Sequence, residues 1–209
     1  MLYKYKNRKE DNTKNKKITR KITQGMYILT TTNGGCVVDA VSQISSGDNP
    51  LISVAVMKSN YTNELLQTNT KFALSVVGKN INPEIIKTFG YNSMRDINKF
   101  ENIETTEINE IKIINDSLGY MVCEIIERID NDTHTLFIGK LVNCDVFKDE
   151  EAISYQYFQE HKDELIQLKI QEGQTSWKCT ICGYIHTGDN PPEKCPLCGV
   201  PADMFVKVE

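Results

Sequence analysis

Four cysteines near the C-terminus are the residues of this sequence best suited to chemistry. They form two C-x-x-C pairs, Cys179 with Cys182 and Cys195 with Cys198, with twelve residues between the pairs, and a glycine directly follows each pair. Each pair can present two thiolates from one tight turn, and four thiolates around one ion indicate tetrahedral zinc or iron. The pattern therefore predicts a metal site, and its spacing leaves the choice between the two metals open.

The segment that carries these cysteines is too short to fold on a hydrophobic core alone. It spans residues 175–209, and a polar, charged stretch at residues 151–174 precedes it. A bound metal must then contribute folding free energy, on the order of 10 kcal/mol for a site of this kind. We predict a small metal domain over residues 175–209, joined by a helical arm and linker over residues 151–174.

Composition and charge narrow the class of protein. The chain has 209 residues with a net charge of −4, and residues 1–21 hold nine Lys or Arg against two acidic residues. We expect residues 1–18 to form a disordered basic extension, and the acidic remainder argues against nucleic acid as a partner. No apolar run approaches the roughly 20 residues that span a bilayer, so we expect no membrane segment.

Cysteine usage and the start of the chain predict a cytoplasmic location. The remaining cysteines, Cys36, Cys123 and Cys144, are scattered and odd in number. Such cysteines fit a reducing compartment better than a disulfide framework. The first residues also lack the apolar core and cleavage site of a secretory signal.

Hydrophobic patterning predicts a mainly β domain over residues 19–150. Its strands are expected at residues 25–32, 36–44, 51–57, 72–77, 118–129 and 133–147, with helices at residues 60–67 and 83–89. Strands and short helices do not alternate regularly, which favours a barrel over a doubly wound sheet. The chain has neither a G-x-G-x-x-G motif nor a phosphate-binding G-x-x-x-x-G-K-[ST] motif, so a nicotinamide donor would dock without a Rossmann domain.

Polar side chains gather at the ends of two predicted strands. They are Ser42, Gln43, Ser45 and Ser46 after one strand, and Lys58, Ser59, Asn60 and Thr62 after another. Hydroxyls, a lysine and a helix N-terminus together can bind a phosphate. Taken alone, the second group is better explained as a helix cap beside a solvated lysine.

The C-terminal residues resemble a rubredoxin. The matching stretches run from Trp177 through Cys182-Gly-Tyr and from Cys195 through Cys198-Gly, and the match covers residues 176–208. They are similar to the short rubredoxin modules of rubrerythrins. The resemblance implies one iron ion, cycling between ferric and ferrous with four cysteine ligands, although a structural zinc ribbon uses the same turns.

Residues 20–150 resemble the flavin reductase-like family of FMN-binding split β-barrel proteins. The resemblance rests on short stretches in the expected order, among them Ala40-Val-Ser-Gln-Ile-Ser-Ser, Val54-Ala-Val-Met-Lys-Ser-Asn-Tyr-Thr and Asp132-Thr-His-Thr. It implies FMN bound by the two polar groups above, His134 as a catalytic residue near flavin and nicotinamide, and a homodimer. Departures from the family pattern include Thr133, which separates Asp132 from His134, and Asp39, which stands where asparagine is common.

Together these features resemble the high-molecular-weight rubredoxins of anaerobes. The resemblance implies an electron-transfer flavoprotein that takes electrons from NAD(P)H through FMN to the rubredoxin iron. The acceptor would be a redox partner protein such as a flavodiiron oxygen or nitric oxide reductase. Two alternatives remain open: a stand-alone flavin or ferric reductase, and an FMN-binding protein with a structural zinc ribbon.

Overall fold

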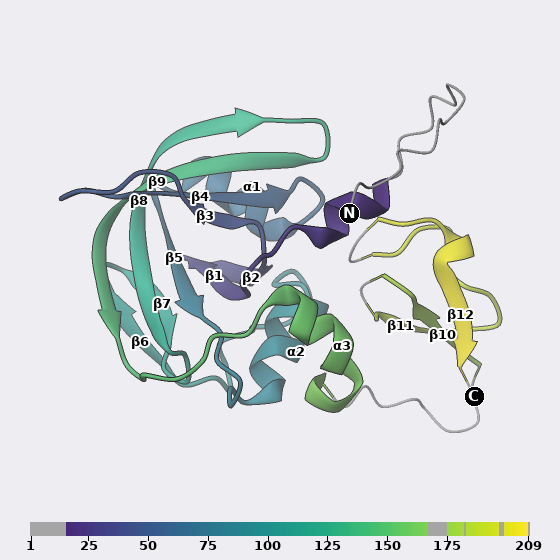
Figure 1. Ribbon diagram of the computed structural model, residues 1–209. Coiled ribbons are helices and arrows are strands. Elements are labelled where there is room, and N and C mark those ends of the chain that lie inside the picture. The colour runs from purple at the N-terminus through teal and green to yellow at the C-terminus, as the bar shows by residue number, and fades with distance from the viewer. Residues whose placement is uncertain (1–15, 167–174, 182, 197–198, 209) are drawn as a thin grey trace, which may run out of the picture.

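The computed structural model describes residues 16–166, 175–181, 183–196 and 199–208. They form a large β domain and a small C-terminal domain, which Figure 1 shows beside each other. No helix among the described residues is both long and apolar enough to cross a membrane.

The large domain is built on one curled antiparallel sheet. Among the described residues this sheet has seven strands in the order β2-β1-β5-β8-β9-β4-β3. Their bounds are β1 (Tyr27–Thr31), β2 (Gly34–Val38), β3 (Val41–Gln43), β4 (Leu51–Met57), β5 (Lys71–Val76), β8 (Gly119–Asp130) and β9 (His134–Val146). The two edge strands, β2 and β3, follow each other in sequence, so the sheet must curl to bring its edges together. The predicted mainly β fold is confirmed.

The interior of the curl is a dry apolar core. Phe72 and Phe137 are fully buried there with Leu29 and Val54. Gly139 of β9 permits this packing, because a Cβ at that position would lie 2.7 Å from the Phe72 ring. The alternating and continuous apolar runs that predicted these strands are thus the residues that fill the core.

The described residues form three α-helices, α1 (Tyr61–Thr68), α2 (Pro83–Tyr91) and α3 (Tyr155–Ile166). Of these, α1 and α2 pack against the sheet and α3 packs against α2. Asn82 caps α2, and Pro83 is in its first turn. The helix was expected at residues 83–89, and it continues two residues further, to Tyr91, with Asn92 at the C-cap. Figure 1 shows α2 and α3 together below the sheet, where their apolar faces share a second core.

Other details departed from the sequence prediction. The predicted strand at residues 36–44 is two strands, β2 and β3, separated at Asp39 and Ala40. A short hairpin, β6 (Thr105–Ile108) and β7 (Ile111–Ile114), was not foreseen. Residues 1–15 of the expected disordered extension lie outside the described residues, whereas Lys16–Lys21 forms the 3-10 helix η1. The expected linker at residues 167–174 also lies outside them.

The C-terminal domain has a small sheet of its own. Its strands β10 (Ser176–Cys179), β11 (Ile185–Thr187) and β12 (Phe205–Val208) are ordered β11-β10-β12, and η2 (Ala202–Met204) precedes β12. Its buried cluster contains Cys179, Cys195 and Phe205. A core this small agrees with the expectation that a metal contributes to its folding.

Candidate functional site

Two cysteine turns of the C-terminal domain share one backbone geometry. The N–H of Gly183 donates to the Cys179 carbonyl at 2.9 Å, and that of Gly199 donates to the Cys195 carbonyl at 2.8 Å. Both glycines are left-handed, with φ of 79° and 71°, which is the conformation that glycine adopts without steric cost. The first cysteine of each turn also donates its N–H to the carbonyl five residues later. The two turns are therefore local repeats of one knuckle.

The knuckles bring one predicted ligand from each pair into a common buried cluster. Cys179 and Cys195 are both buried there, against Phe205 and the partly buried Trp177. Cys182 and Cys198 lie outside the described residues, so the described part of the chain contains only two of the four predicted thiolates. Two identical turns with buried cysteines fit a tetrathiolate metal site, and the surrounding aromatic rings would exclude water from it.

A polar cavity of about 420 Å³ lies between the two domains. Its walls come from the N-terminus of α1, from the loop after α2 and from the C-terminal domain. The lining residues are Ser59, Asn60, Tyr61, Thr62, Tyr91, Asn92, Ser93, Met94, Arg95, Asp96, Lys99, Tyr184 and Pro196. Three of the four residues in the second predicted phosphate-binding set, Ser59, Asn60 and Thr62, therefore line one cavity.

The same three residues also begin α1. Asn60 is its N-cap, and the Asn60 Oδ1 accepts a hydrogen bond from the Thr62 N–H at 2.9 Å. Thr62 is 2 % exposed. The residues that begin and cap the helix therefore also line the cavity.

Lys58 does not line this cavity. Its side chain is exposed and lies 3.6 Å from the Asp130 carboxylate. The two cations that do line the cavity are Arg95 and Lys99. The Arg95 guanidinium pairs with Glu64 and lies 4.5 Å above the centre of the Tyr61 ring.

Lys99 is the cation that sequence reasoning missed. It is 3 % exposed, and its Nζ donates to the carbonyls of Gly35 at 2.9 Å and Phe89 at 3.1 Å. Burial lowers the pKa of Lys99 to about 8, partly opposed by the Cys36 thiol. No local motif marks a buried lysine, because its partners are backbone carbonyls from distant segments.

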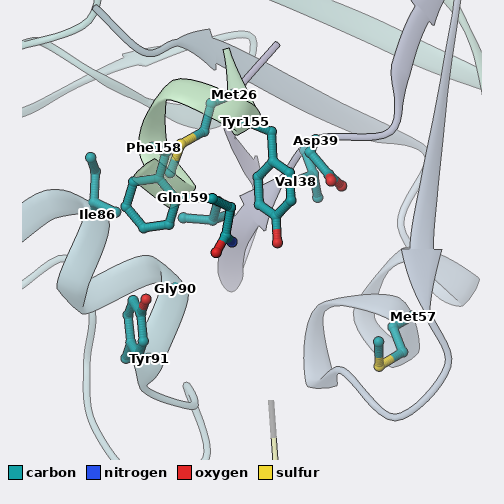
Figure 2. Close-up of a pocket in the computed structure, with 11 residues that line it drawn as sticks. Met26, Val38, Asp39, Met57, Ile86, Gly90, Tyr91, Tyr155, Phe158 and Gln159 are labelled. Carbon is teal, nitrogen blue, oxygen red and sulfur yellow. The ribbon is translucent and has the colours of Figure 1, made fainter. Parts of the chain in front are cut away.

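Figure 2 shows a second, more apolar cavity of about 200 Å³. Tyr91 lines both cavities. Figure 2 shows Tyr155 and Gln159 of α3 projecting toward the space between Tyr91 and Met57. A polar cavity and an apolar one that share a wall residue suit a ligand with a charged end and a flat apolar ring.

Asp39 adds a carboxyl group to the apolar cavity. Burial raises the pKa of Asp39, while hydrogen bonds and the nearby His134 act in the opposite direction. His134 begins β9 beside Met57 of β4, and its Nδ1 lies 2.8 Å from the Thr133 hydroxyl. His134 is half-buried and lines neither cavity, although its strand partner Met57 and the neighbouring Asp39 both line the apolar one.

The first predicted polar group lies elsewhere. Ser42, Gln43 and Ser46 are exposed, and none of the four residues lines either cavity. The Gln43 side chain donates to the Ser45 carbonyl at 2.9 Å, and the Ser45 hydroxyl accepts from the Leu51 N–H at 2.9 Å. Within one chain, these side chains mainly order their own loop.

Two family models match separate parts of the chain. Residues 19–165 match the Flavin reductase like domain, and residues 177–206 match the Rubrerythrin, rubredoxin-like domain. The high molecular weight rubredoxin of Moorella thermoacetica is 28% identical over 90% of this chain and 96% of its own length. A ferric-chelate reductase (NAD(P)H) of Archaeoglobus fulgidus is 30% identical over 65% of this chain and 83% of its own.

Solved structures show the same fold at low sequence identity. The NADH:FAD oxidoreductase SgcE6 of Streptomyces globisporus superposes with a TM-score of 0.60 at 16% identity, over 66% of this chain and 85% of its own. The flavin reductase HpaC, solved with NADP⁺, has a TM-score of 0.59 at 21% identity, over 67% and 90%. The chain therefore belongs to the flavin reductase-like family of oxidoreductases, and its C-terminal domain is of the rubredoxin-like type that rubrerythrins carry.

Proposed function

We propose that this chain is an electron-transfer flavoprotein that passes electrons from NAD(P)H through FMN to a rubredoxin iron and on to a partner protein. One observation carries the proposal. Tyr184, two residues after the first cysteine pair, and Pro196, inside the second pair, line the same cavity as the N-terminus of α1 and Lys99. A flavin and a metal bound at these two places would be neighbours, with no other domain between them.

FMN is the flavin whose parts suit the two cavities. The polar cavity offers Arg95, Lys99 and the hydroxyls of Ser59 and Thr62 to a phosphate. The apolar cavity, which Tyr91 joins to it, offers a site for a flavin ring. When bound, FMN accepts two electrons as a hydride and can release them singly.

Residues near the apolar cavity can manage the accompanying proton. His134 is half-exposed and close to Asp39, whose buried carboxyl has a raised pKa. A histidine in that position can exchange a proton with solvent. We therefore propose His134 as the catalytic residue of the flavin domain, with NAD(P)H as the donor that the name of the related ferric-chelate reductase suggests.

Further parts of the proposal concern the metal, its acceptor and the assembly. We propose iron on the four cysteines, since the C-terminal domain matches the rubredoxin-like type. The acceptor would be a flavodiiron oxygen or nitric oxide reductase, by likeness to the high molecular weight rubredoxins. We also propose domain limits at residues 19–150, 151–174 and 175–209. The proposed location is the cytoplasm.

A homodimer is the assembly we propose. Exposed apolar side chains are spread along β8 and β9, where Ile126 is 56% exposed and Val146 is 74% exposed. Such a surface on a sheet is suited to burial against a second copy. In a dimer, the exposed Ser42, Gln43 and Ser46 would also be available to a flavin at the interface.

The test is an absorbance spectrum of the purified chain with metal analysis, followed by anaerobic addition of NADH or NADPH. We expect flavin bands and ferric-thiolate absorbance, both bleached by the nicotinamide. Zinc without iron, in protein made in iron-replete anaerobic cells, would leave a flavoprotein with a structural ribbon. Bleaching of the flavin bands alone would mean that electrons do not pass from the flavin to the iron.

A second candidate is a stand-alone ferric or free-flavin reductase. It is favoured by the 30% identity to the Archaeoglobus ferric-chelate reductase. Ferric chelate reduction that is unchanged when iron is absent from the C-terminal domain would support it. Tight retention of FMN during turnover would argue against release of free flavin.

A further inference from the structure

We propose that Lys162 of α3 raises the reduction potential of the metal centre by placing a positive charge against the first cysteine knuckle. The inference rests on the proposed function in one respect, because it takes the four cysteines to hold iron. A residue of the large domain would then help to set the reduction potential of the metal centre in the C-terminal domain. The metal centre would then have its full potential only when the two domains are in contact.

The contact itself is close. Gly183 directly follows the second cysteine of the first pair, and a Cβ built on it would lie 3.0 Å from Lys162 Cδ, Cε and Nζ alike. The end of the lysine side chain is therefore in van der Waals contact with the knuckle backbone. Gly183 has a φ of 79°, so a larger residue there would be strained in the turn as well as crowded by the lysine.

The surroundings of Lys162 favour a strong electrostatic effect. The residue is 9% exposed, and its Nζ donates to the Gln159 side chain at 3.3 Å. It lines a cavity of about 440 Å³ between η1, α3 and the first knuckle, together with Thr180 and Ile181. Of the described residues that line this cavity, Lys162 alone is charged. A charge shielded from water acts over a longer range than a solvated one.

The sign of the effect follows from the charge of the iron site. Four thiolates around ferric iron carry a net charge of −1, and addition of one electron makes it −2. No bond or proton has to move in this step. A nearby ammonium stabilises the more negative, reduced form more than the oxidised form, so it raises the potential. A higher potential favours electron flow from the flavin to the iron.

The test is a redox titration of the iron in the full chain, with Lys162→Met, Lys162→Arg and Lys207→Met beside the wild type. Ferric-thiolate absorbance would be followed against a reference dye, so that no nicotinamide is needed. We expect Lys162→Met to shift the ratio of reduced to oxidised iron at a fixed potential about tenfold toward the oxidised form. That shift corresponds to about 59 mV for a one-electron couple.

The other two variants separate charge from packing. Lys162→Arg keeps the charge and should stay close to the wild type, which a merely structural role would not predict. Lys207 is exposed on β12 of the same domain, and its removal should change the ratio by less than about twofold because water screens its charge. Circular dichroism of each variant would verify that α3 remains folded.

The outcomes distinguish this inference from the proposed function. An unchanged potential in Lys162→Met, with iron that NADH still reduces, overturns the role of Lys162 alone. A shifted potential, with iron that neither NADH nor NADPH reduces, supports Lys162 and overturns the electron route. Zinc in place of iron overturns both.

Discussion

Lys99 is held in the protein interior by backbone carbonyls, and it faces the polar cavity from there. Burial lowers the pKa of Lys99 to about 8. The charge of this lysine is therefore present at neutral pH and is lost in the mildly alkaline range. A ligand phosphate that relies on Lys99 must bind less well once that charge is gone.

We predict that FMN affinity falls as pH rises through about 8. Below this pH the Lys99 ammonium attracts the phosphate, and above it the neutral amine does not. Lys99→Met should weaken binding about tenfold or more at pH 7, as expected for loss of a charge-assisted hydrogen bond, and should flatten the pH profile. Quenching of flavin fluorescence between about pH 6.5 and 9.5 measures both effects.

Lys58→Met is the matched control for that experiment. Lys58 is exposed and pairs with Asp130, outside both cavities. Its removal should leave the pH profile unchanged. The phosphate would have to be placed near Lys58 instead if the control, and not Lys99→Met, weakened binding.

Helix α2 shows how a connection between elements fixes one wall of the apolar cavity. The Asn82 N–H at its start donates to Asp116 Oδ2 at 2.8 Å, and Lys148 Nζ donates to Asp116 Oδ1 at 2.6 Å. Burial alone would raise the pKa of Asp116, but the Lys148 and Asn82 hydrogen bonds lower it below its usual value of 3.8. One carboxylate thus connects α2 to the segments before β8 and after β9.

We predict that Asp116→Asn destabilises the chain by about 1 kcal/mol at pH 7. The value is small because the Asp116 and Lys148 side chains are 36% and 35% exposed, so that solvent screens the pair. A carboxyl with a lowered folded pKa contributes stability above pH 3.8 that is lost as pH falls through its folded pKa. Urea unfolding at pH 7 and near pH 3 should show the difference shrinking with acidity.

Asp48→Asn provides the comparison for a carboxylate without this role. Asp48 is exposed in the loop between β3 and β4. Its replacement should leave the free energy of unfolding within about 0.5 kcal/mol of the wild-type value. Equal loss of stability in both variants would point to overall charge, rather than to the Asp116 contacts.

At the scale of the molecule, the two domains have separate cores, and the domains meet at the polar cavity. Phe72 and Phe137 belong to the core of the large domain, and Cys179, Cys195 and Phe205 to that of the small one. The contacts between the domains include Lys162 on Gly183 and the cavity lined by Tyr184. Each domain can therefore lose its cofactor without the core of the other being disturbed.

We predict that Cys195→Ser abolishes ferric-thiolate absorbance while FMN stays bound. The serine hydroxyl is a poor replacement for a thiolate, so the metal and the fold of the small domain should be lost together. Ultrafiltration with metal and flavin analysis of the retained protein measures both cofactors. Loss of FMN as well would mean that flavin binding depends on an intact C-terminal domain.

The sequence by itself determined the local features of this protein. Asn60 caps its helix as its residue type predicted, and the apolar runs became the core strands β4, β5, β8 and β9. The cysteine spacing likewise predicted two knuckle turns. These features depend on contacts between residues that are near in sequence, or on burial that apolar patterning reports.

Only the tertiary structure decided which residues share a cavity. Lys99 reaches carbonyls 64 and 10 residues away, Lys58 turns toward Asp130, and Lys162 meets Gly183 across the domain contact. Long charged side chains have no fixed direction in sequence, because their partners are chosen by how distant elements pack. For that reason the sequence indicated the kinds of cofactor, whereas the fold chose the cations that would face them.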